Sequence, residues 1–149
     1  MISISIDAVS AHTVFLLGLP VDDFMWTAYT VAYTDLAAAA ATNSITLASL
    51  PAKTVLHAAC IKHDSAFAGG TLSNYTLSVG LVGTVDKYAS PFNVFQATGA
   101  SVGQLSGALF CENFTAPTNV LVTGTAVGAL LNAATAGSAT IWLCTTTLP

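Results

Sequence analysis

The chain has very few ionisable side chains and no arginine at all. Only 7% of its 149 residues are charged, and three lysines against seven acids give a formal net charge of −4. Without arginine the protein has no side chain for bidentate contacts with phosphate or guanine, so direct binding to nucleic acid is not expected. Disorder is excluded as well, because disordered chains are poor in apolar residues, whereas 54% of this one is hydrophobic.

The sequence also lacks an uninterrupted apolar run that could cross a membrane. A spanning helix needs about 20 predominantly apolar residues. The stretch 120–143 has this length, but threonine, glycine, asparagine and serine interrupt it repeatedly. These residues favour turns and strands, so we expect buried β-structure there and no membrane partner. The N-terminus has neither a basic start nor a continuous apolar segment, so no secretory signal is expected.

Cysteine is scarce, and its spacing carries no metal or disulfide motif. Cys60, Cys111 and Cys144 are far apart in the sequence, and none belongs to a C-x-x-C pair. An odd number of widely spaced cysteines does not make a disulfide framework or a zinc site. We therefore expect reduced, buried thiols and no cofactor.

What the chain does contain is a series of short segments with the period-two pattern of β-strands. Ile2, Ile4 and Ile6 alternate with polar residues and predict an opening strand. Leu36–Ala41 is interpreted as a connector because it is too short for a self-supporting helix, and 64–70 as a loop. Further strands are predicted at 12–17, 24–34, 44–50, 54–62, 73–82, 91–97, 101–109, 120–127 and 140–146.

This pattern predicts an all-β fold. About eight to ten short strands, with turn signals every 8–15 residues, are typical of an antiparallel β-sandwich that is jelly-roll-like. The length of 149 residues corresponds to a single β-sandwich domain over 1–149. No repeat of fixed period is present, which disfavours a solenoid or a propeller.

The titratable residues form no recognisable catalytic motif. The densest polar cluster is His57, Lys62, His63 and Asp64. His63 and Asp64 have the chemistry of metal ligands or of an acid–base pair, but polar residues are also normal where a strand runs into a turn. No nucleophile elbow, phosphate-binding loop or dinucleotide motif occurs. We predict no catalytic, cofactor-binding or metal-binding residues, and no enzymatic activity.

Two further acidic features are too weak to support a site. Asp22 and Asp23 are adjacent, but the spaced oxygen ligands of a calcium loop do not follow them. Glu112 has no second carboxylate near it in the sequence, so acid and base roles cannot be assigned to a pair.

The shortage of charge favours a protein whose surface is covered by neighbours. Cores of permanent interfaces are depleted in charged residues, which fits a structural component of an assembly. The opening strand then has two interpretations. Ile2, Ile4 and Ile6 belong either to an ordinary edge strand of the same sandwich or to an arm, residues 1–7, that adds a strand to a neighbour's sheet.

Several short motifs resemble a family of small virion proteins of tailed bacteriophages. They are Ile-Lys-His-Asp-Ser-Ala-Phe-Ala-Gly-Gly at 61–70, Lys-Tyr-Ala-Ser-Pro-Phe-Asn-Val-Phe-Gln-Ala at 87–97, and Gly-Ser-Ala-Thr-Ile-Trp-Leu at 137–143 with the closing Leu-Pro. The resemblance covers the chain from about residue 33 onward. It implies a jelly-roll-like domain on the outer surface of the capsid, commonly a trimer, which cements neighbouring major capsid protein subunits. Assembly in the host cytoplasm fits the absence of an export signal.

Two other classes of function stay open from the sequence. The aromatic side chains of Trp26, Tyr29, Tyr33 and Trp142 have the chemistry to stack on sugar rings, as in a receptor-binding head fibre or tail component. A metal-dependent hydrolase around His63 and Asp64 is the second alternative.

Overall fold

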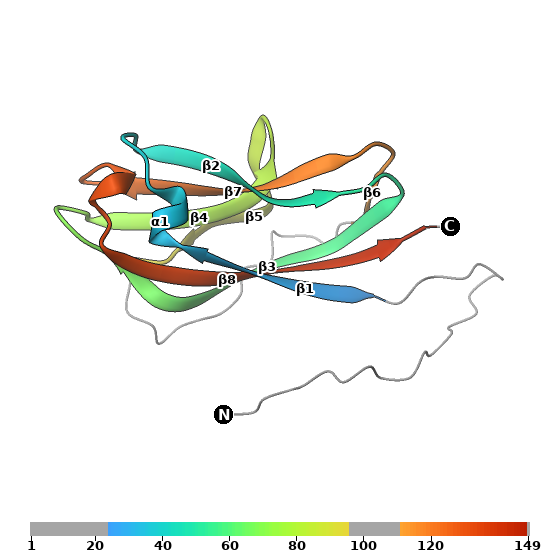
Figure 1. The fold of residues 1–149 in the computed structure, drawn as a ribbon, viewed down its shortest axis with the longest axis horizontal. Coiled ribbons are helices and arrows are strands. Elements are labelled where there is room, and N and C mark those ends of the chain that lie inside the picture. Colours follow the sequence, from blue (N-terminus) through green and yellow to red (C-terminus); the bar gives the residue numbers. More distant parts are fainter. Residues whose placement is uncertain (1–23, 96–110, 149) are drawn as a thin grey trace, which may run out of the picture.

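The computed structural model describes residues 24–95 and 111–148 (Figure 1). The opening strand with Ile2, Ile4 and Ile6, the Asp22-Asp23 pair and the strands predicted at 12–17 and 101–109 lie outside the described residues.

Eight strands and two single helical turns make up the described part of the chain. The helical turns are α1 (Tyr33–Leu36) and the 3-10 turn η1 (Leu131–Ala133). Neither these nor any other helix within 24–95 and 111–148 is long and apolar enough to cross a membrane. The strands are β1 (Met25–Ala32), β2 (Thr42–Leu50), β3 (Thr54–Ala68), β4 (Asn74–Leu81), β5 (Thr84–Asn93), β6 (Glu112–Phe114), β7 (Thr118–Val127) and β8 (Ala136–Thr147).

The strands form two antiparallel four-stranded sheets that face each other. One sheet has the order β1-β8-β3-β6, and the other has the order β2-β7-β4-β5. The first four strands alternate between the two sheets, and β8 lies beside β1. This is the connectivity of a jelly roll. Figure 1 shows the two layers, with α1 closing one end between them. The predicted antiparallel sandwich is confirmed.

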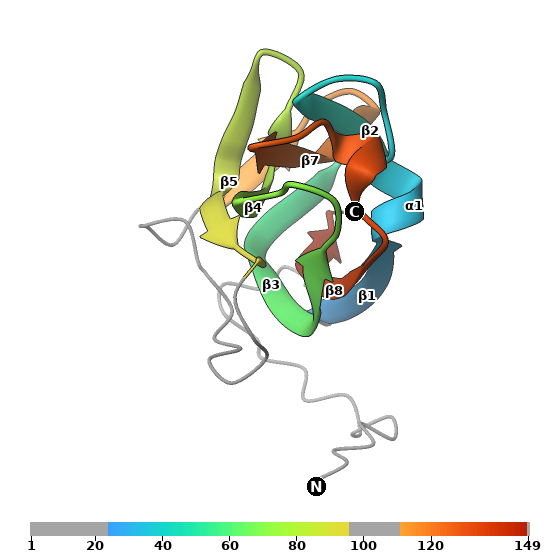
Figure 2. The same cartoon turned by 90° about the vertical axis from the view of Figure 1, so that its left-hand side faces the viewer.

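The core lies between the sheets because alternate residues of each strand point inward. In β8, Ala139, Ile141 and Leu143 are buried, whereas Trp142 between them is exposed. This alternation is the period of two that the sequence displays. Figure 2 looks along the sandwich and shows how the layers enclose the interior. The other large core side chains include Leu56, Ile61, Phe67, Tyr75, Leu77, Val79, Tyr88, Val120 and Val122.

The helical turn α1 directly precedes the connector predicted at Leu36–Ala41 and shares Leu36 with it. The turn α1 ends at Leu36, whose side chain is fully buried, and residues 37–41 are not helical. Asp35 Oδ2 accepts a hydrogen bond of 2.8 Å from the Ala32 backbone N–H at the start of the turn. This bond satisfies one of the amides that a helix leaves without an internal partner.

The sequence prediction omits the short strand β6, and it differs most from the structure at two other strands. The loop predicted at 64–70 is wrong, because β3 continues to Ala68 and pairs there with Ala136 of β8 across several register shifts. The strand predicted at 91–97 begins earlier, since β5 starts at Thr84 directly after a two-residue turn. Gly83 in that turn has a φ of 85°, a conformation that favours glycine.

Candidate functional site

The polar cluster singled out in the sequence is divided by the two faces of β3. Lys62 Nζ lies 2.8 Å from Asp64 Oδ1, and Thr140 Oγ1 donates a 2.5 Å hydrogen bond to Asp64 Oδ2. Burial alone would raise the pKa of Asp64, but the hydrogen bonds from Lys62 and Thr140 and the lysine charge outweigh it and hold the pKa below its ordinary value. The carboxylate is thus ionised and its oxygens are already occupied.

His63 points away from this cluster. It pairs with Ala139, a core residue, and only 5% of its surface is exposed. Its Nε2 is buried and has no hydrogen-bond partner within the described ranges. Because His63 and Asp64 leave the strand on opposite sides, the structure does not bring them together around one metal ion.

His57 makes contacts that the sequence did not predict. It is the extra residue where the β3–β8 register shifts between Leu56 and Ala58. Its Nε2 lies 2.9 Å from Thr146 Oγ1, and its Nδ1 lies 3.4 Å from Cys111 Sγ. The ring of Phe24 meets it edge-on, with centroids 4.6 Å apart. Burial lowers the pKa of His57, which favours the neutral ring and a hydrogen-bonding role.

The three thiols differ in exposure. Cys144 is buried as predicted and Cys60 is half-buried, but the prediction that Cys111 is buried is wrong, because it is exposed beside His57. Burial raises the pKa of Cys60 and of Cys144, so both thiols are protonated at neutral pH and are poor nucleophiles.

Glu112 is isolated in the sequence but connects the two sheets in the fold. It lies on β6, and its Oε1 is 2.6 Å from Lys87 Nζ of β5 in the opposite sheet. Tyr88 of β5 donates a 2.7 Å hydrogen bond to Glu112 Oε2. Burial opposes ionisation of Glu112, but the bonds from Lys87 and Tyr88 dominate and lower its pKa. Burial is the main cause that raises the pKa of Tyr88, and the hydrogen bond and negative charge of Glu112 raise it further.

We predict that Glu112→Gln lowers the free energy of unfolding by about 1 kcal/mol at pH 7, since a hydrogen bond to a charged group is replaced by a neutral one. Because the folded pKa of Glu112 is depressed, its contribution is present above the ordinary pKa of glutamate and disappears as the pH falls through the folded value. Urea denaturation at pH 7 and pH 3 measures this. The exposed Asp86→Asn is the matched control, and equal losses in both variants, or a loss that persists at pH 3, contradict the prediction.

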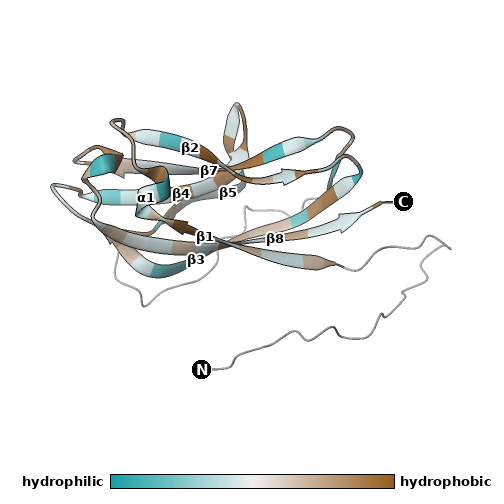
Figure 3. Ribbon diagram, in the orientation of Figure 1, coloured by the Kyte–Doolittle hydropathy of each residue, from teal (hydrophilic) through white to brown (hydrophobic). Residues whose placement is uncertain are grey.

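The outer face of the β1-β8-β3 layer carries two exposed large apolar side chains, Trp26 and Trp142. We define the tryptophan face as six residues that point outward from these strands in two adjacent rows: Trp26, Ala28, Ala58, Cys60, Trp142 and Cys144. Trp26 pairs with Cys144, and Ala28 pairs with Trp142. Ala58 and Cys60 of β3 continue the same two rows. Trp26 is 47% exposed and Trp142 is 37% exposed. In Figure 3 the β1 ribbon shows no strongly hydrophilic colour, which agrees with its lack of charged residues.

The nearest charged residues lie in the row next to this face. The next row along the strands consists of Thr30, Thr140 and Lys62, and Asp64 lies beside Lys62. The two tryptophans are diagonal neighbours on adjacent strands, a spacing within reach of large side chains. An uncharged face with two exposed indole rings has the composition of a binding surface.

The four aromatic candidates for stacking on a ligand are not equivalent in the fold. Tyr29 and Tyr33 pack against the core and are only partly exposed. Trp26 and Trp142 alone of the four project together from the tryptophan face. Sequence alternation places Trp26 opposite Tyr29 across the strand, but it does not show which of them faces the core.

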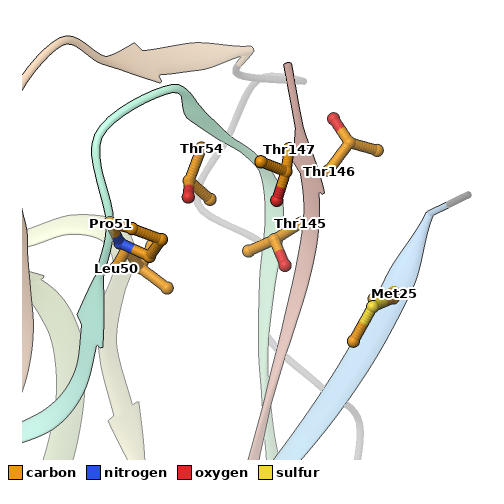
Figure 4. Close-up of a pocket in the computed structure, with 7 residues that line it drawn as sticks. All are labelled: Met25, Leu50, Pro51, Thr54, Thr145, Thr146 and Thr147. Carbon is orange, nitrogen blue, oxygen red and sulfur yellow. The ribbon is translucent and has the colours of Figure 1, made fainter. Parts of the chain in front are cut away.

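A pocket of about 460 Å³ lies at the end of the sandwich where β1, β2, β3 and β8 meet (Figure 4). Thr54 in its wall is buried, and its Oγ1 has no hydrogen-bond partner among the described residues. The lining has hydroxyl and apolar groups but no titratable side chain, so it offers no group for acid–base chemistry. The lining residues are Met25, Leu50, Pro51, Thr54, Thr145, Thr146 and Thr147.

Metal-binding geometry is likewise absent from residues 24–95 and 111–148, where no three His, Cys, Asp or Glu side chains are grouped so that they could hold an ion.

Comparison with solved structures finds a similarity of fold. No protein-family model and no curated protein matches the chain. Among solved structures, a chain of the cyanophage Pam1 capsid asymmetric unit is similar, with a TM-score of 0.59 and 22% sequence identity. The likeness covers 85% of this chain and 86% of that chain, so it extends over nearly the whole of both. At this identity it shows a shared fold.

Proposed function

We propose that this protein is a structural virion protein that decorates and cements a tailed-phage capsid by bridging neighbouring major capsid protein subunits. The observation that carries the proposal is the tryptophan face, where Trp26 and Trp142 are exposed together on a surface free of charge. The shared fold with a chain of a phage capsid asymmetric unit and the sequence resemblance to small virion proteins support the same assignment.

The physical basis of cementing is the burial of this face. Removing apolar surface from water contributes about 25 cal/mol per Å², and large aromatic side chains in a packed interface contribute most of the binding energy. A protein that binds the assembled lattice, but not dissociated subunits, stabilises the lattice by mass action. Such a protein needs an interaction surface and no catalytic group.

The proposal includes the partners and the place of action. The major capsid protein is the binding partner, and the protein itself assembles as a homotrimer on the outer surface of the capsid after synthesis in the host cytoplasm. A trimer presents three tryptophan faces to the lattice, so its overall affinity for the capsid exceeds that of a single face.

The test uses capsids of the phage that encodes the chain, depleted of this protein and then incubated with purified variants. Each tryptophan is replaced singly, as Trp26→Ala and Trp142→Ala. We expect each change to weaken binding about 30-fold or more, because a central aromatic contact contributes about 2 kcal/mol or more. Occupancy is measured by quantifying the protein in pelleted capsids, and cementing by the temperature at which the capsids release DNA.

Val82→Ala is the control, since Val82 is 84% exposed in the turn between β4 and β5 of the other sheet. The control should bind like the unaltered protein. Full occupancy by both tryptophan variants overturns the role of this face. Capsids that release DNA at the same temperature with and without the protein overturn the cementing function.

The paired tryptophans also favour a second candidate, a glycan-binding component. Sugar rings stack on exposed aromatic side chains, and Trp26 and Trp142 form such a platform. Here the alanine variants would retain capsid binding but lose a glycan-array signal and adsorption to the host. The two functions therefore predict opposite results in the occupancy experiment.

A further inference from the structure

Strand β1 has one edge that pairs with no other strand in the described part of the chain. It is the terminal strand of its sheet, with β8 on one side only. Exposed edges in soluble proteins are usually protected by proline, by charged residues or by a bulge. The eight residues of β1 are Met-Trp-Thr-Ala-Tyr-Thr-Val-Ala, and their pairing with β8 has no register shift. This edge therefore offers a row of backbone groups without these protections.

Beside that edge runs a groove of about 590 Å³ between the two sheets. Tyr29 of β1 and Ile45 and Leu47 of β2 are only partly buried there and form an apolar floor. Asp35 is the one acidic residue of the lining, which has no basic residue. The complete lining is Ala28, Tyr29, Thr30, Val31, Asp35, Ile45, Thr46 and Leu47.

A strand added to the β1 edge would face two different environments. Its inward side chains would lie over Ile45 and Leu47, and its outward side chains would lie beside Ala28 and Thr30. The strand that fits has apolar residues at alternate positions and small polar residues between them.

We propose that the segment Ile2–Ile6 of this chain fills the groove as an additional strand of the β1-β8-β3-β6 sheet. Its sequence is Ile-Ser-Ile-Ser-Ile, with no charge and no proline. The three isoleucines occupy the inward positions and the two serines the outward ones. The added strand therefore forms backbone hydrogen bonds with the edge of β1 and at the same time covers the apolar floor of the groove.

The length of the intervening chain allows this placement. Residues 7–23 separate the segment from Phe24, which directly precedes β1. Seventeen extended residues span up to about 55 Å, whereas the eight residues of β1 extend about 26 Å. The segment is therefore long enough to reach the groove of its own copy.

The proposal does not depend on capsid binding, so it is tested on the isolated full-length protein. Thr30 is exposed on β1, and Ser5 is an outward position of the added strand. Ser5→Cys and Thr30→Cys are combined in a background carrying Cys60→Ala, Cys111→Ser and Cys144→Ala. Circular dichroism and the melting temperature establish that this background is folded.

Mild oxidation should form a disulfide between the two introduced cysteines. We expect at least about tenfold more cross-linked product than in either single variant, because the tether holds the thiols at about millimolar local concentration. A product of monomer mass places the segment in its own groove, and a product of higher mass places it in a neighbour's. Either product supports the proposal that the segment Ile2–Ile6 fills the groove.

The control pair joins Ser5→Cys to Val82→Cys, which lies in the β4–β5 turn, and should not cross-link. A second variant with Ile2→Ser, Ile4→Ser and Ile6→Ser should lose the cross-link, whereas Ser3→Ala should retain it. Absence of the Ser5–Thr30 disulfide in the folded protein overturns the proposal. Efficient dimer formation by Thr30→Cys alone also overturns it, because that result means that two β1 edges pair with each other.

Discussion

Replacing Phe67 with alanine should lower the free energy of unfolding by about 3–5 kcal/mol, the usual loss for a large aromatic side chain in a core. Phe67 lies on β3 and is fully buried. Its ring packs 4.7 Å from that of Tyr75 on β4, so this pair joins the two sheets. A Cβ at Gly137 would lie 2.4 Å from Phe67 Cγ, which shows how closely β8 approaches the ring.

Urea denaturation followed by circular dichroism measures this loss. The melting temperature should fall by about 6–20 °C, given about 2–4 °C per kcal/mol for a chain of this size. Phe67→Leu, which removes less volume, should lose less stability than Phe67→Ala, and the surface change Val82→Ala should have little effect. A loss below about 1 kcal/mol in Phe67→Ala would show that the two sheets do not depend on this contact.

Raising the pH above 10 should destabilise the protein strongly through Tyr75. Its side chain is fully buried, and its hydroxyl has no hydrogen-bond partner in the described ranges. Burial raises the pKa of Tyr75 to about 12 from the model-compound value of 10.0. Between these two values the unfolded chain loses a proton that the folded chain retains, so stability falls as the pH rises.

The expected contribution from Tyr75 is about 2 kcal/mol at pH 12 and approaches about 3 kcal/mol only at higher pH, since each pKa unit corresponds to about 1.4 kcal/mol. The variant Tyr75→Phe should be as stable as the unaltered protein at pH 7, or about 1 kcal/mol more stable, because it removes a buried hydroxyl without a partner. It should also lose less stability between pH 9 and pH 12. A smaller loss of stability should remain in the variant, because the pKa of Tyr88 is raised as well. Identical pH profiles for the two proteins would contradict the prediction.

Sequence periodicity was sufficient to predict the fold class and most of the strands. Alternation in 24–34, 44–50, 73–82 and 140–146 corresponds closely to β1, β2, β4 and β8. The stretch 120–143, apolar enough to raise the question of a membrane helix, contains most of β7 and two thirds of β8. The reason is local: the threonine, glycine and β-branched residues there favour strands and turns over helices.

The errors arose where pairing with a distant strand outweighs local preference. The stretch at 64–68 has the composition of a loop, yet β8 provides partners for Ser65 and Ala68 across irregular register. Pro91 suggested the start of a strand, but β5 is at the edge of its sheet and tolerates a proline within it. The contacts of Glu112 with Lys87 and Tyr88, like that of Cys111 with His57, join residues that no short-range pattern connects.

The position of the candidate surface could not be predicted from the sequence, and its role as an interaction surface stays a prediction. The shortage of charge indicated an interaction surface. The alternation of residues in 24–34 separately placed aromatic side chains on both sides of the strand that corresponds to β1. Only the pairing of Trp26 with Cys144 and of Ala28 with Trp142 shows which side is exposed and that the two indoles share it. The assignment of Ile2, Ile4 and Ile6 to an interface stays a prediction, now with a defined groove as its target.

The position of β8 has a consequence for how the protein folds. Strands β1 and β3 are both paired with β8, which follows them in the sequence by more than a hundred and by about seventy residues. During synthesis these two strands have no shared partner until β8 leaves the ribosome, and the sheet closes only then. Such non-local pairing is typical of folding in milliseconds to seconds. A nascent or truncated chain ending before residue 136 would expose unsatisfied strand edges, and we expect it to depend on chaperones or to aggregate.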